Sequence, residues 1–392
     1  MFNVKKLNKI APVIYDYLPK EEYKVSSGLD GFDALMVRSA NCHEIELPER
    51  LLTIVRAGAG TNNIPVDACT EKGIVVFNTP GANANGVKEL VIGSMIAAAR
   101  NLFDAYAWAQ TLKGKGDQVP SLIEQGKKQF VGGELKGKTL GVIGLGAVGV
   151  MVANTATEIG MNVIGYDPFM SVEQAWTIST RAERAEQLED LLNHADYISL
   201  HIPQNEHTKN FLCTREFSKM KPGVILLNFA RGGLVKTISV LDAIEAGIVA
   251  KYVTDFPDGD LIGQKNIIAI PHLGASTPES EENCAMMAAQ QLRDFLEEGT
   301  IVNSVNLPEC VLAKSGKERI TLIHKNTPNM VGQITNAIAD HEINIADMVN
   351  KSKGDIAYTV LNLDQPINQG VLEELNKISG MIRTRVICSN EK

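Results

Sequence analysis

Three short segments of the sequence combine side chains that could transfer a proton alongside a hydride. Residues 228–233 contain Arg231, residues 254–260 contain several acids, and residues 271–277 contain His272. A guanidinium can bind a carboxylate and polarise the neighbouring carbonyl group, and an imidazole can exchange the proton of a hydroxyl group. An acid beside the imidazole would orient it and raise its pKa toward the working pH. Together these groups suit hydride transfer between a small 2-hydroxy acid and a cofactor.

A glycine turn upstream of these segments could hold that cofactor. Residues 139–168 predict a strand, a turn, a helix and a second strand, and Gly144, Gly146 and Gly149 form a G-x-G-x-x-G pattern. Such a turn lets the backbone approach a pyrophosphate, which the helix amides and the helix dipole then bind. Asp167, which follows the second strand, could accept hydrogen bonds from both ribose hydroxyls and would repel a 2′-phosphate. The pattern therefore predicts a dinucleotide site that prefers NAD to NADP.

The surrounding elements predict a parallel sheet that positions these groups. Beyond the turn, the expected strands are residues 197–201, 224–229, 252–256 and 267–270, and the expected helices are residues 185–193 and 240–246. The three chemical segments follow the last three of these strands, and open α/β sheets bind ligands at the carboxyl ends of their strands. Runs at residues 34–38, 52–56 and 74–77 predict an earlier α/β unit, and residues 89–111 predict one long helix that bridges two domains.

The C-terminal part predicts a separate small module. A helix is expected at residues 277–299, followed by a linker at residues 301–316. The remaining pattern is βαββαβ, which is typical of a ferredoxin-like module. Its expected elements are strand 320–324, helix 330–340, strands 343–349 and 356–363, helix 371–379 and strand 382–387.

Composition limits the classes of partner. The 392 residues suffice for two or three domains, and the net charge of −8 argues against a nucleic-acid or anionic-membrane surface. No signal peptide or membrane span is expected, so we expect a cytoplasmic protein. The six cysteines are widely spread without a C-x-x-C pair, so neither a disulfide framework nor a metal site is expected.

From about residue 34 onward, the sequence resembles the D-isomer-specific 2-hydroxyacid dehydrogenases. The resemblance rests on residues 55–64, 77–80, 89–90, 230–232 and 271–277 together with the glycine turn, and the C-terminal module resembles an ACT domain. It implies an α/β protein with a Rossmann-type doubly wound NAD-binding domain at residues 93–275. It further implies a discontinuous flavodoxin-like substrate domain at residues 1–92 and 276–308, and a ferredoxin-like regulatory domain at residues 317–392.

The resemblance also implies roles for individual residues. Arg231 would bind the substrate carboxylate and His272 would act as the acid/base. Besides the three glycines, the cofactor would contact Ala147, Val148, Asp167, Pro203, Ala230 and Asp255. The substrate would contact Arg38, Ser39, Gly60 and Asn83. An L-serine effector would bind the C-terminal module through His324, Asn326 and Asn344.

Two positions depart from the family pattern. A glutamate is common two residues after the proline of the acidic segment, but this chain has Gly259 there, between Asp258 and Asp260. Asp260 is the preferred partner of His272, with Asp258 as the alternative. Relatives also often carry an additional arginine near the Arg-Ser pair, but this chain has Arg38, Ser39 and Ala40 there, so a substrate phosphate would meet fewer cations.

The resemblance implies NAD-dependent oxidation of 3-phosphoglycerate to 3-phosphohydroxypyruvate, the first step of L-serine biosynthesis. The C-terminal module would either place this activity under allosteric control by serine or serve only as a structural dimerisation domain. The alternatives are a glyoxylate or hydroxypyruvate reductase, another D-2-hydroxyacid dehydrogenase, and a non-enzymatic NAD-sensing binding protein or corepressor. A homodimer or homotetramer is expected, formed through residues 89–111 and the C-terminal sheets.

Overall fold

The computed structural model describes residues 1–388, and internal contacts divide the chain into two units. The first unit comprises Met1–Asn83 and the chain from Glu281 onward, and the second comprises Ala84–Ser280. These divisions fall close to the predicted boundaries of the discontinuous domain, while the C-terminal module shares the first unit. The division into three domains stays a prediction. No helix in the described part of the chain is both long and apolar enough to cross a membrane.

The second unit, Ala84–Ser280, is built on a sheet of seven parallel strands. They are β6 (Thr139–Ile143), β7 (Asn162–Tyr166), β8 (Glu183–Arg184), β9 (Tyr197–Leu200), β10 (Val224–Asn228), β11 (Val249–Thr254) and β12 (Ile267–Ala269). Their order is β12-β11-β10-β9-β6-β7-β8. The direction of winding reverses between β6 and β9, which is where doubly wound sheets bind their ligands. The predicted Rossmann-type sheet is confirmed.

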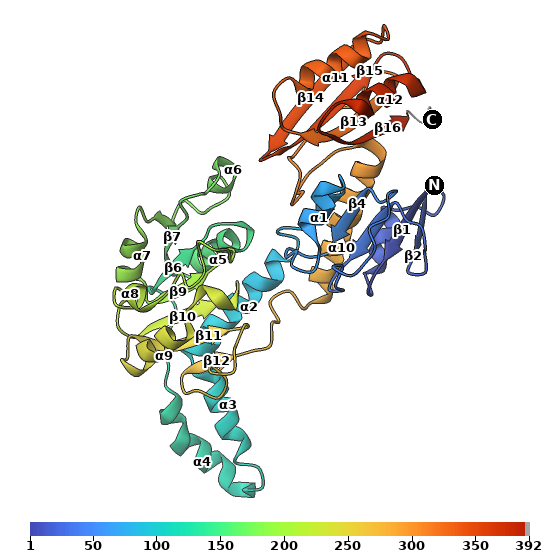
Figure 1. Ribbon diagram of the computed structural model, residues 1–392. Helices are drawn as coiled ribbons and strands as arrows, with labels where there is room; N and C mark the ends of the chain where they lie inside the picture. Colours follow the sequence, from blue (N-terminus) through green and yellow to red (C-terminus); the bar gives the residue numbers. More distant parts are fainter. Residues whose placement is uncertain (389–392) are drawn as a thin grey trace. The chain divides into compact units, whose positions relative to one another are not determined.

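Helices cover both faces of this sheet (Figure 1). On one face, α2 (Ala84–Ala99) and α5 (Ala147–Glu158) share a buried core with β6 and β7. On the other face, α7 (Leu188–His194), α8 (Thr214–Phe217) and α9 (Thr237–Glu245) form a second core. The short helix α6 (Val172–Ala175) follows β7. Because both faces are covered, the strands read as near-continuous apolar runs.

The predicted long helix at residues 89–111 is wrong, because the structure divides it into α2 and α3 (Leu102–Gln110). Asn101 lies between them with φ of 52°, a left-handed conformation that asparagine tolerates better than most residues. Its Nδ2 donates to the carbonyl of Val131 at 3.1 Å, and its Oδ1 accepts from Lys251 Nζ at 2.5 Å. These tertiary contacts stabilise a break between α2 and α3 at which the sequence has neither a proline nor a glycine. Helix α4 (Val119–Gly126) follows α3.

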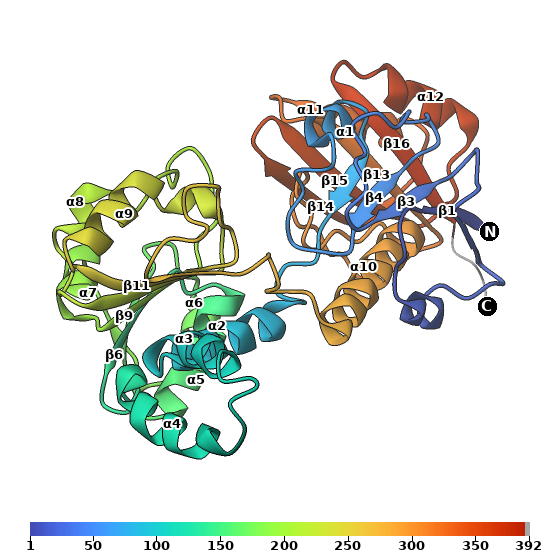
Figure 2. The same ribbon diagram turned by 90° about the horizontal axis from the view of Figure 1, so that it is seen from below.

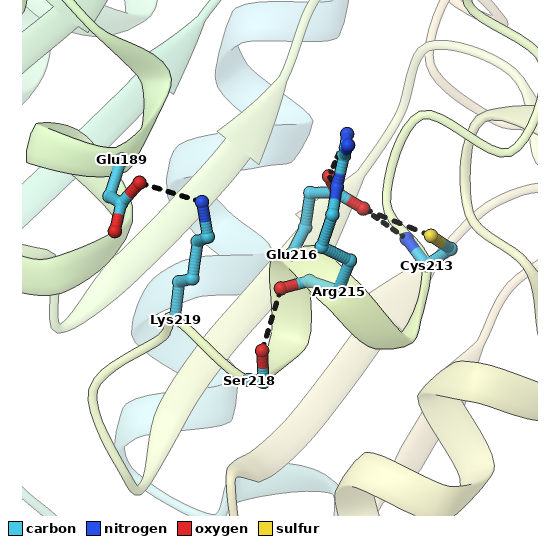
Figure 3. A network of polar contacts seen from close by, with 6 residues as sticks. All are labelled: Glu189, Cys213, Arg215, Glu216, Ser218 and Lys219. Carbon is cyan, nitrogen blue, oxygen red and sulfur yellow. Dashed lines mark hydrogen bonds and ion pairs between the residues drawn. The ribbon is translucent and has the colours of Figure 1, made fainter.

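A polar network holds α8 at its N-terminal end (Figure 3). The buried carboxylate of Glu216 accepts hydrogen bonds from the backbone N and the Sγ of Cys213, at 3.2 and 3.0 Å, and pairs with Arg215 at 2.7 Å. Burial alone would raise the pKa of Glu216, but the hydrogen bonds from Cys213 and Arg215 outweigh it and hold that pKa below its ordinary value. Cys213 is therefore part of a helix cap. Nearby, Lys219 pairs with Glu189 of α7 at 2.6 Å.

Within residues 1–83, the first unit contains a parallel sheet of five strands. They are β1 (Phe2–Lys6), β2 (Tyr23–Ser26), β3 (Ala34–Val37), β4 (Thr53–Arg56) and β5 (Val75–Phe77), in the order β2-β1-β3-β4-β5. This order confirms the predicted flavodoxin-like domain. Helix α1 (Val66–Glu71) precedes β5, and α10 (Pro278–Glu298) buries its apolar side against the sheet.

The C-terminal module, residues 318–388, forms an antiparallel sheet of four strands. They are β13 (Glu318–Lys325), β14 (Ile345–Lys353), β15 (Ile356–Leu363) and β16 (Met381–Cys388), in the order β14-β15-β13-β16. Helices α11 (Met330–Ala339) and α12 (Gln369–Lys377) pack on one face of this sheet (Figures 1 and 2). The predicted βαββαβ order is confirmed.

The opposite face of this sheet binds the C-terminal end of α10. Arg385 donates from Nη1 to the carbonyl of Phe295 at 3.0 Å and from Nη2 to that of Leu296. Arg319 Nη1 donates to the carbonyl of Glu298 at 2.8 Å, and the hydroxyl of Tyr358 donates to that of Gly299 at 2.7 Å. The last carbonyls of a helix lack partners within it and attract cations. The module thus caps the helix on which it rests.

Arg319→Ala should destabilise the first unit by about 3 kcal/mol or more, because Arg319 is 1% exposed and its loss leaves one buried and two partly buried acceptors without this donor. These acceptors are Asn362 Oδ1 and the carbonyls of Glu298 and Leu312, each at 2.8 Å. Urea unfolding would measure the change. The control is Arg50→Ala, which removes an ion pair with Asp33 from a half-exposed side chain and should cost less than about 1 kcal/mol. Equal losses in the two variants would contradict the capping role.

Candidate active site

The register of the second sheet brings the chemical segments to one edge. Ile143 lies opposite Leu200, Leu200 opposite Asn228, Asn228 opposite Thr254, and Thr254 opposite Ala269. Since all these strands are parallel, the residues that follow them emerge side by side. The glycine turn, Ala230 with Arg231, Asp255, and His272 are therefore neighbours along this edge. Pro203 follows β9 at the same edge.

The glycine turn has the geometry that a bound pyrophosphate needs. Gly144 has φ of 90°, and a Cβ there would lie 2.7 Å from the carbonyl oxygen of His201. A Cβ on Gly149 would lie 1.9 Å from the carbonyl oxygen of Gly144, so only glycine allows α5 to start so close to β6. Nothing lies within 4 Å of a Cβ placed on Gly146. That open side, at the start of α5 with Ala147 and Val148 in its first turn, fits a dinucleotide phosphate.

Asp167 is held beside this turn by two backbone amides. Its Oδ2 accepts from Leu145 N at 2.8 Å and its Oδ1 accepts from Phe169 N at 2.9 Å. A cavity of about 320 Å³ adjoins the carboxylate, large enough for part of a nucleoside. Glu183 and Arg184 also line it. The residues directly after Asp167 include no cation, but Arg184 brings one to the wall of this cavity. The carboxylate of its neighbour Glu183 balances that charge.

Arg231 presents its guanidinium to solvent from a rigid backbone. Asn228, at the end of β10, is fully buried and its Nδ2 donates to the carbonyl of Arg231 at 2.9 Å, while its Oδ1 accepts from the backbone N of Ala230 and Arg231. The guanidinium donates to the carbonyl of Ala230 at 2.7 Å, and the described residues give it no ion pair within 4 Å. An anchored guanidinium without an acidic partner is suited to bind a ligand carboxylate.

His272 contacts the same aromatic ring as Arg231. The ring centroids of Phe256 and His272 are 4.4 Å apart, and Arg231 Cζ lies 5.8 Å from the Phe256 centroid. His272 has φ of 34°, which is unusual for a residue with a side chain, and its backbone N donates to the carbonyl of Asp255 at 2.9 Å. The exposed imidazole and the guanidinium thus flank one ring at the ligand edge of the sheet.

The three acids after β11 have different environments. Asp255 is 1% exposed, and its Oδ2 accepts from Gly274 N at 3.1 Å. Asp258 is exposed and closes its own loop by accepting from the backbone N of Asp260 and Leu261 and from Thr237 Oγ1. The side chain of Asp260 is exposed and has no hydrogen bond or ion pair among the described residues. No finding tests the assignment of Asp260 to His272, which stays a prediction.

The expected substrate residues lie in the first unit. Asn8, with φ of 69°, accepts through Oδ1 from the backbone N of Arg38, Ser39 and Ala40, which shapes the turn after β3. Arg38 pairs with Glu281 at 2.7 Å and is about two-fifths exposed. The carbonyl of Gly60 accepts from the Arg56 guanidinium, and Asn83 lies directly before α2.

Asn8, Asn228 and Phe256 are supporting residues that the sequence analysis did not identify. For Asn228 the available signal was an asparagine near the end of the expected strand at residues 224–229. For Asn8 the sequence analysis offered no such signal, because it expected no strand before residue 34.

The expected effector residues have unequal access to a ligand. His324 is 1% exposed, and both ring nitrogens have partners, the carbonyl of Lys325 at 2.9 Å and Thr359 Oγ1 at 2.8 Å. Asn326 and Asn344 are exposed, and their Nδ2 atoms bond Gly354 O and Asp364 Oδ2. Only the two asparagines therefore offer polar atoms at the surface.

Burial lowers the pKa of His324, although hydrogen bonds with Lys325 and Asn350 act in the opposite direction. The folded state therefore disfavours protonated His324. Above about pH 6.5, the ordinary histidine pKa, His324 is neutral and its full contribution to the free energy of unfolding is present. As the pH falls below that value, this contribution is lost. When the pH is lowered from about 7.5 to about 5.5, the free energy of unfolding should therefore fall less in the His324→Gln variant than in the unsubstituted chain. Urea midpoints at both pH values would measure this, and identical losses would contradict it.

The comparisons with known proteins agree with this geometry. Residues 92–274 match the family described as D-isomer specific 2-hydroxyacid dehydrogenase, NAD binding domain. A D-3-phosphoglycerate dehydrogenase of Methanocaldococcus jannaschii is 35% identical over 88% of this chain, which spans 64% of that relative's length. The Escherichia coli K12 enzyme of the same name is 32% identical over 88% of this chain and 83% of its own.

A solved structure shares the fold as well as the sequence. The NAD⁺-bound 3-phosphoglycerate dehydrogenase of Entamoeba histolytica is 30% identical, with a TM-score of 0.61, over 78% of this chain and 98% of its own. Since Gly144, Gly146 and Asp167 here have the geometry of a dinucleotide site, the family's cofactor suits this chain. The chain belongs to the D-isomer-specific 2-hydroxyacid dehydrogenases, and its cofactor is NAD.

Proposed function

We propose that the chain oxidises 3-phosphoglycerate to 3-phosphohydroxypyruvate with NAD, the first step of L-serine biosynthesis. The observation that carries the proposal is the placement of Arg231 and His272 on one ring, Phe256, at the sheet edge that also bears the glycine turn. The named relatives in Methanocaldococcus jannaschii and Escherichia coli support the choice of substrate.

The residues of the chain divide the chemistry between binding and proton transfer. Arg231 binds the substrate carboxylate and holds the hydroxyl carbon in place. His272 removes the hydroxyl proton as the carbonyl group forms, and returns it in the reverse direction. NAD, when bound, accepts the hydride that leaves the same carbon. The first turn of α5 and Asp167 hold the cofactor through its pyrophosphate and ribose, and Pro203 and Ala230 line the same edge.

The substrate phosphate needs cations outside this group. Arg38 is the main candidate in the first unit, while Lys88 is a candidate on α2. Gly60 and Asn83 would complete the substrate contacts. The pairing of Arg38 with Glu281 is half-exposed, so a phosphate can compete with that carboxylate for the guanidinium.

We further propose that the protein is a cytoplasmic homo-oligomer. Exposed apolar side chains at Leu102, Phe103 and Tyr106 on α3 and at Ile123 on α4 offer a surface for a second copy. The edge strand β14 of the C-terminal sheet offers another, because its outer backbone groups could pair with those of another chain.

His272→Gln should lower kcat for 3-phosphoglycerate oxidation by about 10²-fold or more, because no other group would accept the hydroxyl proton. NADH fluorescence should still report cofactor binding. The control is His194→Gln, an exposed position on α7, which should match the unsubstituted chain. The assay should include glyoxylate, hydroxypyruvate and unphosphorylated 2-hydroxy acids. Faster turnover of these compounds would favour the reductase alternative, and no turnover of any substrate would favour a NAD-sensing protein.

L-serine at about millimolar concentration should slow 3-phosphoglycerate oxidation and raise the melting temperature, because a ligand that binds the folded state stabilises it. An amino-acid zwitterion needs both donors and acceptors, which Asn326 and Asn344 provide. D-serine is the matched control ligand, and Asn344→Ala should reduce the response. The regulatory role would be abandoned if neither the rate nor the melting temperature responded.

A further inference from the structure

We propose that Glu281 is a specificity-determining residue, whose carboxylate binds the guanidinium of Arg38 and competes for it with a substrate phosphate. The inference rests on the proposed function, in which the substrate carries a phosphate and Arg38 is the main cation that meets it. Glu281 takes no part in proton or hydride transfer. Its role is to set how tightly the chain binds phosphorylated 2-hydroxy acids relative to unphosphorylated ones.

The first sheet has a ligand edge of its own, and Arg38 lies on it. In the order β2-β1-β3-β4-β5 the direction of winding reverses between β1 and β3, and open α/β sheets bind ligands beyond the carboxyl ends of their strands at such a point. Arg38 directly follows β3, and Lys6 at the end of β1 lies opposite Met36, so the chain leaves both strands at the same edge. A cation at this place is suited to an anionic ligand.

The backbone donors of this turn are already occupied. Asn8, which follows β1, accepts through Oδ1 from the three successive backbone N–H groups of residues 38–40, at 3.4, 3.1 and 2.8 Å. Successive N–H groups of this kind can otherwise form a concave site for an anion. Because Asn8 fills this position, an anion at the turn depends on side-chain donors, of which the guanidinium of Arg38 is the charged one.

The guanidinium of Arg38 is partly occupied by Glu281, which lies near the start of α10. Nη2 of Arg38 is 2.7 Å from Oε1 of Glu281, and about two-fifths of each side chain is exposed. Water can therefore reach both charges, and an ion pair at this exposure changes an equilibrium constant by at most about fivefold. A doubly charged phosphate, which offers more acceptor oxygens, can replace the carboxylate without a large cost.

A second guanidinium supports the turn from the neighbouring strand end. Arg56 Nε donates to the carbonyl of Arg38 at 2.9 Å, and its Nη1 donates to the carbonyl of Gly60. Burial raises the pKa of the Cys284 thiol, while the positive charges of Arg38 and Arg56 oppose that rise. Both guanidiniums therefore lie near the same point of α10, one turn after Glu281. A phosphate that displaces this carboxylate meets two positive charges.

Glu281 weakens phosphate binding in two ways. In the protein without substrate, its carboxylate must be displaced from Arg38 before a phosphate can bind there. In the complex, its negative charge remains nearby and repels the phosphate. An unphosphorylated hydroxy acid places no charge at Arg38, so neither effect acts on it. Removal of the Glu281 charge should therefore favour phosphorylated compounds selectively.

Glu281→Gln tests this assignment, because glutamine keeps the size of the side chain but removes its charge. The KM for 3-phosphoglycerate should fall about three- to tenfold, while kcat and the KM for NAD should stay within about twofold. The KM for hydroxypyruvate in the reverse direction should also stay within about twofold. The matched control is Glu282→Gln, which removes the adjacent exposed carboxylate on α10 and should leave all these constants unchanged.

Inorganic phosphate is the probe for the protein without substrate, with NADH present to fill the glycine turn and sodium chloride to keep the ionic strength constant. The phosphate concentration that gives half of the rise in melting temperature should be about three- to tenfold lower in Glu281→Gln than in the unsubstituted chain. In the Arg38→Gln background, Glu281→Gln should have no further effect, because the carboxylate acts through that guanidinium.

Glu281→Ala should act in the same direction, and melting temperatures without phosphate would identify a variant that fails to fold. The proposal is overturned if Glu281→Gln leaves the phosphate midpoint unchanged or raises it, or if the same change appears in the Arg38→Gln background. Because the phosphate titration needs no turnover, it separates failure of this proposal from failure of the proposed function. A chain that binds phosphate as expected but oxidises no 3-phosphoglycerate would contradict the proposed function alone.

Discussion

The whole active edge depends on the parallel register of β6, β9, β10, β11 and β12. Their last residues lie opposite one another, so the chain leaves each strand at the same level. That level is where the amides at the start of α5, the guanidinium of Arg231 and the imidazole of His272 can act on a common ligand. A shift of one residue in any pair would turn the following side chain to the other face of the sheet.

Buried polar groups hold this edge in place. Asn228 bonds the backbone of Ala230 and Arg231, and Asp255 bonds Gly274 and the backbone of His272. Both residues are almost fully buried, so their hydrogen bonds gain from a low dielectric and suffer if one partner is lost. The exposed side chains of Arg231 and His272 are thereby carried by a rigid backbone, which would reduce the entropy lost when a ligand is oriented there.

The first unit uses two arginines for a different purpose. Arg385 donates to the carbonyls of Phe295 and Leu296 and Arg319 donates to that of Glu298, at the C-terminal end of α10, and burial lowers the pKa of both arginines. The N-terminal part of the same helix presents Glu281 to Arg38. The C-terminal module and Arg38, one of the expected substrate residues, therefore contact opposite ends of one helix.

The sequence by itself determined the elements whose signals are local. The glycine turn, Asp167, the strand runs and the βαββαβ module follow from spacing, because steric freedom and apolar periodicity act over a few residues. Only the tertiary structure decided the break at Asn101, the burial of His324 and the different surroundings of Asp255, Asp258 and Asp260. These depend on which distant groups meet, such as Lys251 with Asn101 or Gly274 with Asp255, and on the dielectric that burial creates. The spacing of residues along the chain specifies neither the distant partners nor this dielectric.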